Sequence, residues 1–243
     1  MTDNTIKNTI LNGRIELWQP QDGYRASIDP ILLAAATHPA DHAKVIDLGC
    51  GVGTIGLCLY NYNKSLSFTG VEIQENLCDL ARKNAPQDNF NFINQSIGNI
   101  DLIDFDCAVM NPPYYEEGAH IPSPSSMKAM AHAGRLEMWF EVSARILKKG
   151  GTLTGILPAM RFNDMIKYCR KYQFGKMQLY PVFSRFDMPA KRIIFQVRLH
   201  KSGETVFHRG LVLHDGNGRK YTDEAQSVLS GENKIDAFVK GMK

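Results

Sequence analysis

Two short stretches of the chain combine residue types that suit ligand binding and reaction. The first is VIDLGCGVGTIG, in which Asp47 is followed by glycines at positions 49, 51, 53 and 56. The second is NPPY, Asn111 to Tyr114, directly after an apolar run. Asn111 offers an amide oxygen, the prolines hold φ near about −65° without donating hydrogen bonds, and Tyr114 offers a flat ring. Rigid acceptors beside an aromatic ring suit a flat substrate with N–H groups, whereas a proline pair alone indicates only the end of a strand.

The glycine stretch is compatible with two classes of ligand. Gly51 to Gly56 fits the dinucleotide pattern G-x-G-x-x-G, and Glu72 follows 21 residues after Gly51, where an acid would bind ribose hydroxyls. By themselves these residues would support an NAD-dependent oxidoreductase. Asp47 favours a different ligand, because a carboxylate just before the turn would repel a pyrophosphate and attract an ammonium group. A zwitterionic ligand is therefore preferred, and NAD remains the remote alternative.

The elements around these motifs alternate between strand and helix. Strands are predicted at 44–49, 67–73, 90–96, 106–113, 152–158, 176–183 and 192–201. Helices are predicted at 54–63, 74–85, 127–148 and 161–173. The alternation predicts an α/β fold with a doubly wound, mostly parallel seven-stranded sheet, and the last two strands form an antiparallel edge hairpin. In such a sheet the segments after the first and fourth strands lie side by side, so both motifs would border one crevice.

The N-terminal part adds a short extension to this core. Asn-Gly at 12–13 separates two apolar-alternating pieces and predicts a hairpin. Asp29 is expected to be the N-cap of the next helix, with Pro30 at its first helical position. We expect one domain over 1–243, with an N-terminal extension (1–40), a core (41–202) and a C-terminal extension (203–243).

Composition and charge indicate the compartment and a class of partner. The 243 residues are 44% hydrophobic and 22% charged, and the N-terminus lacks a signal-peptide pattern. Five cysteines without a CxxC pair predict a cytoplasmic protein with neither disulfides nor a zinc site, and His38 and His42, separated by Pro39, predict no metal site either. Residues 160–210 contain 11 Lys/Arg against 3 Asp/Glu, although the whole chain carries only +3. Such asymmetry suggests a polyanionic partner for the C-terminal third, although solvated surface charge would give the same count.

The D-x-G-x-G-x-G stretch followed by an acidic strand end resembles the class I S-adenosylmethionine (SAM) methyltransferases, which have a Rossmann-like fold. The resemblance implies SAM as the cofactor. It implies that Asp47 and the loop with Gly49, Gly51 and Gly53 line the methionine end, and that Glu72 accepts both ribose hydroxyls. Family members often carry an acid near the adenine of SAM. This chain has NQS at 94–96 there, so Ser96, or its neighbours Asn94 and Gln95, would have to serve.

The second motif resembles the N-P-P-Y box of amino-methyltransferases that act on adenine, cytosine, guanine or glutamine nitrogen. A conjugated exocyclic amine is a poor nucleophile because its lone pair is delocalised. The Asn111 side-chain oxygen and the Pro112 carbonyl would accept its two N–H groups and stabilise the positive charge that develops on nitrogen. Pro113 would keep these acceptors fixed, and Tyr114 would stack on the base.

A further resemblance runs along nearly the whole chain and is carried by GYRASIDPILLAA, the NPPY box, AMAHAGRLEMWFEVSARILKKGG and the basic PAKRIIFQVRLHK. Together these stretches resemble the bacterial tRNA-valine adenine-N6 methyltransferases, which methylate the adenine just 3′ of the anticodon. In that family the segment before the glycine stretch lies over the cofactor. Tyr24, Arg25 and Asp29 would then contact SAM or close the pocket, with Arg25 as a partner for the methionine carboxylate.

An RNA substrate would also explain the basic C-terminal third. Arg185, Lys191 and Arg192 flank a short predicted loop and would contact RNA phosphates. Amino-methylation of rRNA, DNA or a protein glutamine remains an alternative, as does a non-catalytic RNA-binding module.

Overall fold

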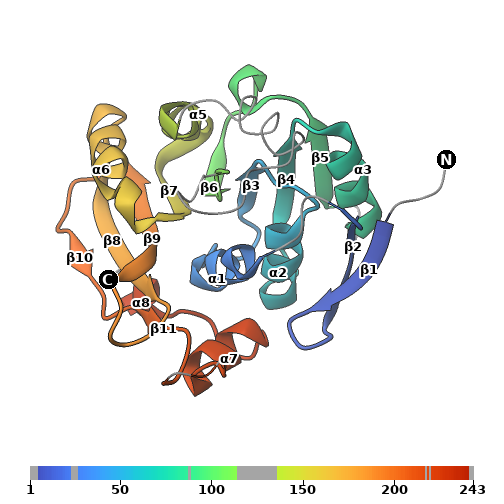
Figure 1. Cartoon of the computed structure of the whole chain (residues 1–243). Helices are drawn as coiled ribbons and strands as arrows, with labels where there is room; N and C mark the ends of the chain where they lie inside the picture. Colours follow the sequence, from blue (N-terminus) through green and yellow to red (C-terminus); the bar gives the residue numbers. More distant parts are fainter. Residues whose placement is uncertain are drawn as a thin grey trace.

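The computed structural model describes residues 5–22, 27–86, 89–113, 136–216, 218 and 220–240 of the chain. Its central element is a nine-stranded sheet (Figure 1). The parallel strands are β3 (Lys44–Leu48), β4 (Ser67–Glu72), β5 (Phe90–Asn94), β6 (Phe105–Met110) and β7 (Leu147–Pro158). They lie in the order β7-β6-β3-β4-β5, so the chain leaves β3 first to one side and then returns to the other. The predicted doubly wound α/β sheet is confirmed, and its switch point lies between β3 and β6.

The β7 side of the sheet continues in antiparallel and very short strands. β9 (Ala190–Leu199) pairs antiparallel with β7, and β8 (Phe174–Phe183) pairs antiparallel with β9. β10 (Val206–Phe207) and β11 (Leu211–Val212) then pair parallel with β8. The seven predicted strands are therefore present together with these two. A two-residue strand is too short to show an alternating pattern, so β10 and β11 could not be predicted from periodicity.

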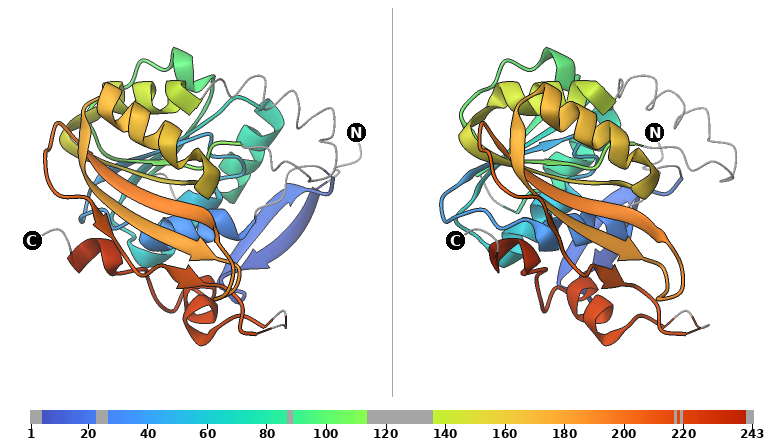
Figure 2. Two further views of the ribbon diagram at one scale, coloured as in Figure 1. Left: turned by 60° about the vertical axis from the view of Figure 1, so that its left-hand side comes forward. Right: turned by 90° about the vertical axis from the view of Figure 1, so that its left-hand side faces the viewer.

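Helices cover both faces of the sheet (Figure 2). The helices with described positions are α1 (Ile28–Ala36), α2 (Thr54–Tyr62), α3 (Glu75–Asn84), α5 (Leu136–Ile146), α6 (Phe162–Lys171), α7 (Asp223–Leu229) and α8 (Ala237–Lys240). Val45 of β3 packs in one apolar cluster with α1 and α2, whereas its neighbour Ile46 packs in another with α5 and α6. This alternation explains why β3 reads as a continuous apolar run. Within the described ranges, no helix combines the length and apolarity needed to cross a bilayer.

Two helix ends differ from the sequence-based prediction. Ser27, not Asp29, is the N-cap of α1, and its side chain accepts a hydrogen bond from the Asp29 backbone N–H at 3.3 Å. A serine hydroxyl caps as well as a carboxylate, and the start at Ser27 leaves the Asp29 side chain free to pair elsewhere. The helix predicted to end at Lys148 ends at Ile146, and β7 begins at Leu147. The Gly150–Gly151 pair therefore lies inside β7, beside an irregularity in its pairing with β6, instead of ending the helix.

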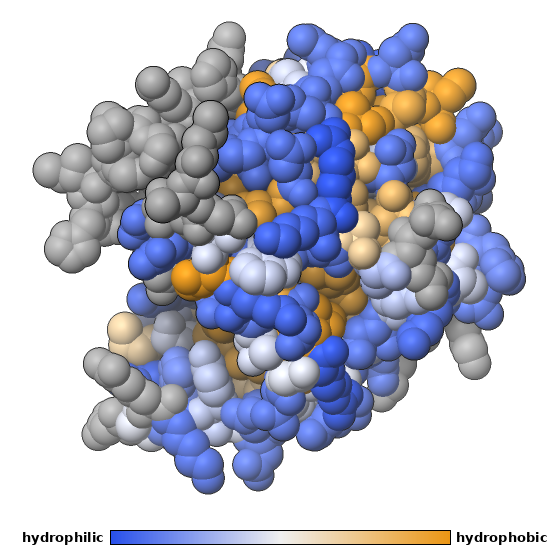
Figure 3. All heavy atoms as spheres, turned by 90° about the vertical axis from the view of Figure 1, so that its right-hand side faces the viewer, coloured by the Kyte–Doolittle hydropathy of each residue, from blue (hydrophilic) through white to orange (hydrophobic). Residues whose placement is uncertain are grey.

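The two ends of the described chain pack onto the core at separate places. The predicted N-terminal hairpin consists of β1 (Thr5–Ile10) and β2 (Ile15–Pro20). It is fixed to α3 by Asn84, whose side chain exchanges two hydrogen bonds with the Trp18 backbone. Figure 3 shows this side of the molecule, where hydrophilic side chains cover most of the face. At the other end, the Ile235 N–H donates to the Ala35 carbonyl, which ties the C-terminal segment to α1.

Candidate active site

A pocket of about 320 Å³ opens at the carboxyl edge of the parallel strands, a volume typical of small-molecule sites. Both chemical motifs reach it, as the predicted crevice requires. Its wall includes Gly49, Gly51, Glu72, Ser96, Asn111 and Pro112. These residues come from the ends of β3, β4, β5 and β6, and Leu48 of β3 lies directly opposite Met110 of β6. The pocket therefore lies at the switch point of the sheet.

The glycine turn between β3 and α2 has a left-handed backbone at its three first glycines. The φ angles are +69° at Gly49, +55° at Gly51 and +84° at Gly53, which is the N-cap of α2. At Gly49 a second constraint applies, because a Cβ atom there would lie 2.6 Å from Cη2 of Trp139. Gly53 does not line the pocket but sets the start of α2. At Gly49 and Gly51 the turn presents backbone without side chains to the pocket, as a closely held ligand needs.

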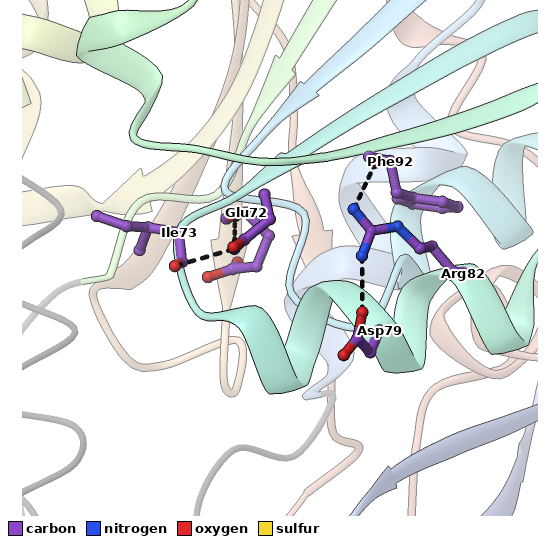
Figure 4. A network of polar contacts seen from close by, with 6 residues as sticks. Glu72, Ile73, Asp79, Arg82 and Phe92 are labelled. Carbon is purple, nitrogen blue, oxygen red and sulfur yellow. Dashed lines mark hydrogen bonds and ion pairs between the residues drawn. The ribbon is translucent and has the colours of Figure 1, made fainter.

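Glu72 ends β4 next to Ile73 (Figure 4), and both of its carboxylate oxygens accept hydrogen bonds from backbone N–H groups. Oε2 accepts from the Gly51 N–H at 2.9 Å and Oε1 accepts from the Gln74 N–H at 2.8 Å. Burial raises the pKa of Glu72, and these N–H groups partly offset the effect. The Ile73 N–H and the Gln74 side chain also donate to Glu72, so the carboxylate is held in one orientation at the pocket wall.

The nearby Arg82 belongs to a separate network in Figure 4. Its guanidinium donates to Asp79 Oδ1 at 2.6 Å and to the Phe92 carbonyl at 3.0 Å. None of these contacts involves Glu72, so they do not neutralise its charge.

Asp47 is fully buried and does not itself line the pocket. Neither of its carboxylate oxygens has a hydrogen-bond partner in the part of the chain that the structure describes. Burial raises its pKa well above the ordinary value, and the charge of Glu72 adds to the rise. A buried carboxylate without a partner is costly, so this arrangement suits a protein that binds a cationic ligand beside the turn.

Asn111 follows β6 and faces the pocket with Pro112 and Pro113. Its side-chain Oδ1 is buried and has no hydrogen-bond partner among the described residues. The oxygen is an acceptor held at the pocket without its own donor, which is the property the NPPY interpretation requires. Tyr114, predicted to stack on the substrate, lies outside the described residues.

The segment after β5 supplies another wall of the pocket. Gln95, Ser96 and Ile97 line it. Asn94 instead turns away, and its Nδ2 donates to the Glu72 carbonyl at 2.9 Å. Of the three polar candidates in this stretch, Gln95 and Ser96 are therefore in place to face a ligand, whereas Asn94 supports the end of β4.

Asp29 also lines the pocket, but its side chain is already engaged. Arg192 Nε lies 3.0 Å from Asp29 Oδ2, and the two side chains are 21% and 8% exposed. Arg192, predicted to contact RNA phosphates, thus connects the start of β9 to the pocket wall. Arg185 and Lys191 do not line the pocket and lie around the turn between β8 and β9. Tyr24 and Arg25 fall outside the described residues.

Trp139 of α5 is a pocket residue that the sequence did not single out. Its indole is only 3% exposed, lies against Gly49 and contributes to the pocket wall. One tryptophan in an amphipathic helix looks like an ordinary core residue, and its partner Gly49 is 90 positions away. Among the described residues, no group of three or more His, Cys, Asp or Glu is arranged to hold a metal ion.

Comparison with known proteins identifies similar sequences. The family model "Methyltransferase small domain" matches residues 29–178. A tRNA1(Val) (adenine(37)-N6)-methyltransferase from Pedobacter heparinus is 27% identical over 238 residues, which are 92% of this chain and 97% of that protein. A protein of the same name from Glaesserella parasuis is 24% identical over 215 residues, 83% of this chain and 87% of that protein.

Solved structures share the fold at lower identity. A protein described as a predicted O-methyltransferase from Agrobacterium tumefaciens superposes with a TM-score of 0.70 at 19% identity, covering 85% of this chain and 98% of its own. M. jannaschii TYW2 in complex with AdoMet gives a TM-score of 0.56 at 13% identity, covering 82% and 87%. At these identities the likeness shows a common architecture.

Proposed function

The chain belongs to the methyltransferase small domain family, and from this premise we propose that it methylates the exocyclic N6 of an adenine in tRNA, next to the anticodon. It is a SAM-dependent methyltransferase. The observation that carries the finer proposal is a pair of buried acceptors without partners among the described residues: Asp47 near the end of β3, and Asn111, which follows the neighbouring strand β6 and lines the pocket. Asp47 suits a cationic cofactor and Asn111 suits an amine substrate.

The residues present fit the cofactor. SAM supplies an electrophilic methyl group on a sulfonium when it is bound. The side-chain-free turn at Gly49 and Gly51 would accept its methionine end, and Asp47 would balance positive charge there from below the turn. Glu72 would accept the ribose hydroxyls, and Ser96 would lie toward the adenine.

Asn111 would act on the substrate amine. Its Oδ1 would accept one N–H and the Pro112 carbonyl the other, which favours a pyramidal nitrogen whose lone pair is available for attack. As the nitrogen becomes positively charged, both hydrogen bonds strengthen, so the acceptors stabilise the transition state more than the bound substrate. Pro113 limits the backbone motion that would misplace these oxygens. The methylated ammonium then releases its surplus proton to solvent.

The names of the relatives support tRNA as the substrate, since those proteins are described as acting on adenine 37 of tRNA1(Val). The positive charge of residues 160–210 supports a polyanionic partner. We propose that Arg185 and Lys191 contact RNA phosphates, and that Arg192 acts through its pairing with Asp29 instead. A tRNA substrate would place the protein in the cytoplasm.

The test is transfer of labelled methyl groups from SAM to total tRNA. Asn111→Ala should lower the turnover number by about 100-fold to 1,000-fold, as expected for a lost transition-state acceptor. SAM affinity, measured by calorimetry, should change little because the cofactor contacts remain. Asn163→Ala, at an exposed position on α6, is the matched control and should retain full activity.

Product analysis separates the finer proposal from its competitors. Digestion of the labelled tRNA should yield N6-methyladenosine, and mapping should place it beside the anticodon. Equal turnover by the wild type and Asn111→Ala would contradict the role of Asn111. Label in rRNA, DNA or protein, with none in tRNA, would contradict the proposed substrate.

A further inference from the structure

An exposed apolar surface stands beside the pocket on the β7 side of the sheet. It consists of residues 158–161, the end of β7 and the turn after it, and 184–191, the β8–β9 turn with the first two residues of β9. We call it the hairpin wall. Phe186 is 92% exposed, Met160 71% and Met188 46%. Large apolar side chains grouped on a surface indicate an interaction site more often than isolated ones do.

Strand register places the wall next to the pocket. Met110, just before Asn111, lies opposite Gly155 of β7, so β7 continues three residues further to Pro158. At about 3.3 Å per residue, β7 extends about 10 Å beyond the level of Met110. Pro158 pairs with Arg192, whose side chain reaches Asp29 in the pocket wall. In the right-hand view of Figure 2, the β8–β9 turn lies clear of α6 at the lower right.

The charge of the wall is compatible with RNA. Arg185 and Lys191 flank the apolar tip, and Asp187 is the only acid between positions 184 and 191. The Met188 N–H donates to the Arg185 carbonyl at 3.2 Å, so the tip is a tight turn that presents Phe186 outward. An exposed aromatic ring between cations is how proteins hold unstacked bases of single-stranded RNA.

We propose that the hairpin wall binds the single-stranded RNA beside the target nucleotide, with Phe186 stacking on a flanking base. This inference rests on the proposed function and adds a recognition surface to it. A base that leaves its stack to enter the pocket exposes its neighbours, and the wall gives one of them an aromatic partner. Arg185 and Lys191 would hold the phosphates on either side.

The experiment measures the affinity of the full-length protein for a synthetic anticodon stem-loop RNA, without SAM. Phe186→Ala should weaken binding by about 5-fold to 100-fold, the loss expected for one stacked base. Phe186→Trp should retain or improve it, because the larger ring still stacks. Phe207→Ala, also at an exposed phenylalanine (64%), is the matched control, since β10 pairs with β8 at Leu179, well before the turn. SAM affinity should be unchanged in all three variants.

The outcomes distinguish failure of the hairpin-wall proposal from failure of the proposed function. Wild-type RNA affinity in Phe186→Ala would overturn the wall proposal even if the enzyme methylates tRNA. Loss of self-association or of vesicle binding in Phe186→Ala, with RNA affinity intact, would overturn it in favour of a second copy or a lipid surface. If the wild type binds the stem-loop through Phe186 but methylates no tRNA, the proposed function fails and the wall stands.

Discussion

At the scale of single residues, Asp47 shows how a binding site costs stability. Its carboxylate is fully buried, and the described part of the chain gives it no hydrogen-bond partner. Burial and the charge of Glu72 raise its pKa, so the native state holds a proton at Asp47 more tightly than the unfolded chain does. Because the native state then binds more protons, its stability falls as pH rises through the unfolded pKa, about 3.9, towards the native one.

Asp47→Asn should therefore stabilise the protein without cofactor while it weakens cofactor binding. We expect the free energy of unfolding at pH 7 to rise by about 1 to 2 kcal/mol, and the gain to shrink as the pH falls below about 4, where Asp47 becomes protonated in both states. SAM affinity should fall at least about 10-fold, since a carboxylate that balances its positive charge is lost. Urea unfolding at several pH values and calorimetry of SAM binding measure the two effects.

Asp106→Asn is the control of opposite sign. Although burial alone raises the pKa of Asp106, hydrogen bonds from Lys148 and the Lys44 N–H lower it overall. Its contribution to stability should therefore be present above pH 4, and the substitution should not stabilise the protein at neutral pH. A destabilised Asp47→Asn, or one with unchanged SAM affinity, would show that Asp47 has a structural role only.

Local sequence patterns predicted where the site residues lie in the fold better than they predicted what surrounds each side chain. The spacing of Asp47, the glycines and Glu72 placed them at strand ends, because it reflects the period of a βαβ unit. The depth of Asp47 beneath the turn depends on packing that no local pattern encodes. The pairing of Arg192 with Asp29 spans 163 positions, so sequence suggested a solvent-exposed cation where the structure has a partly buried ion pair.

At the scale of elements, the contact between the glycine turn and α5 shapes the pocket. Trp139 occupies the space where a side chain at position 49 would project. Gly49→Ala combines this overlap with a φ of +69°, which favours glycine. We expect a loss of about 2 to 4 kcal/mol in the free energy of unfolding, together with weaker SAM binding, because Trp139 would be displaced from the pocket wall.

Gly13→Ala separates the two causes. Gly13 has a φ of +84°, but an added Cβ there meets nothing within 4 Å. Its cost should be about 1 kcal/mol, from backbone conformation alone, without an effect on SAM. Denaturant unfolding and calorimetry on both variants would show the difference. Equal losses of stability would mean that the Trp139 contact contributes nothing.

Elements with a clear period were predicted well, and the errors occurred where two local signals competed. The strands and helices around both motifs are present because alternating and helical periods indicate burial on known faces. Ser27 and Asp29 are both residue types that favour the N-cap position. The hydrogen bond from the Asp29 N–H to the Ser27 side chain shows that Ser27 is the cap. The glycines at 150–151 indicated a helix end, but they lie at the irregularity in the pairing of β7 with β6. A left-handed glycine such as Gly150 is common both at helix ends and at irregularities in strands.

At the scale of the whole molecule, cations and pocket share one edge of the sheet. Arg185 and Lys191 lie around the β8–β9 turn, beyond the carboxyl end of β7, which runs parallel to the strands that form the pocket. The composition indicated a basic C-terminal third, but only the antiparallel pairing of β9 with β7 brings part of it to the pocket. RNA bound there would place its backbone within reach of both side chains.

This arrangement predicts how RNA affinity depends on salt. Each phosphate contact releases bound counterions, so the logarithm of the association constant falls linearly with the logarithm of salt concentration. Arg185→Gln and Lys191→Gln should each reduce the steepness of that line by about 0.7 to 1, and the double substitution by about twice as much.

Lys64→Gln is the control, because this exposed residue lies just before β4 and so at the opposite edge of the sheet; it should leave the slope unchanged. Fluorescence anisotropy of a labelled stem-loop RNA between 50 and 300 mM salt, roughly the range where such slopes are resolved, gives the measurement. Parallel lines for the wild type and the double variant would mean that RNA is held by another face, whereas a reduced slope with unchanged SAM affinity would assign these two cations to the RNA backbone.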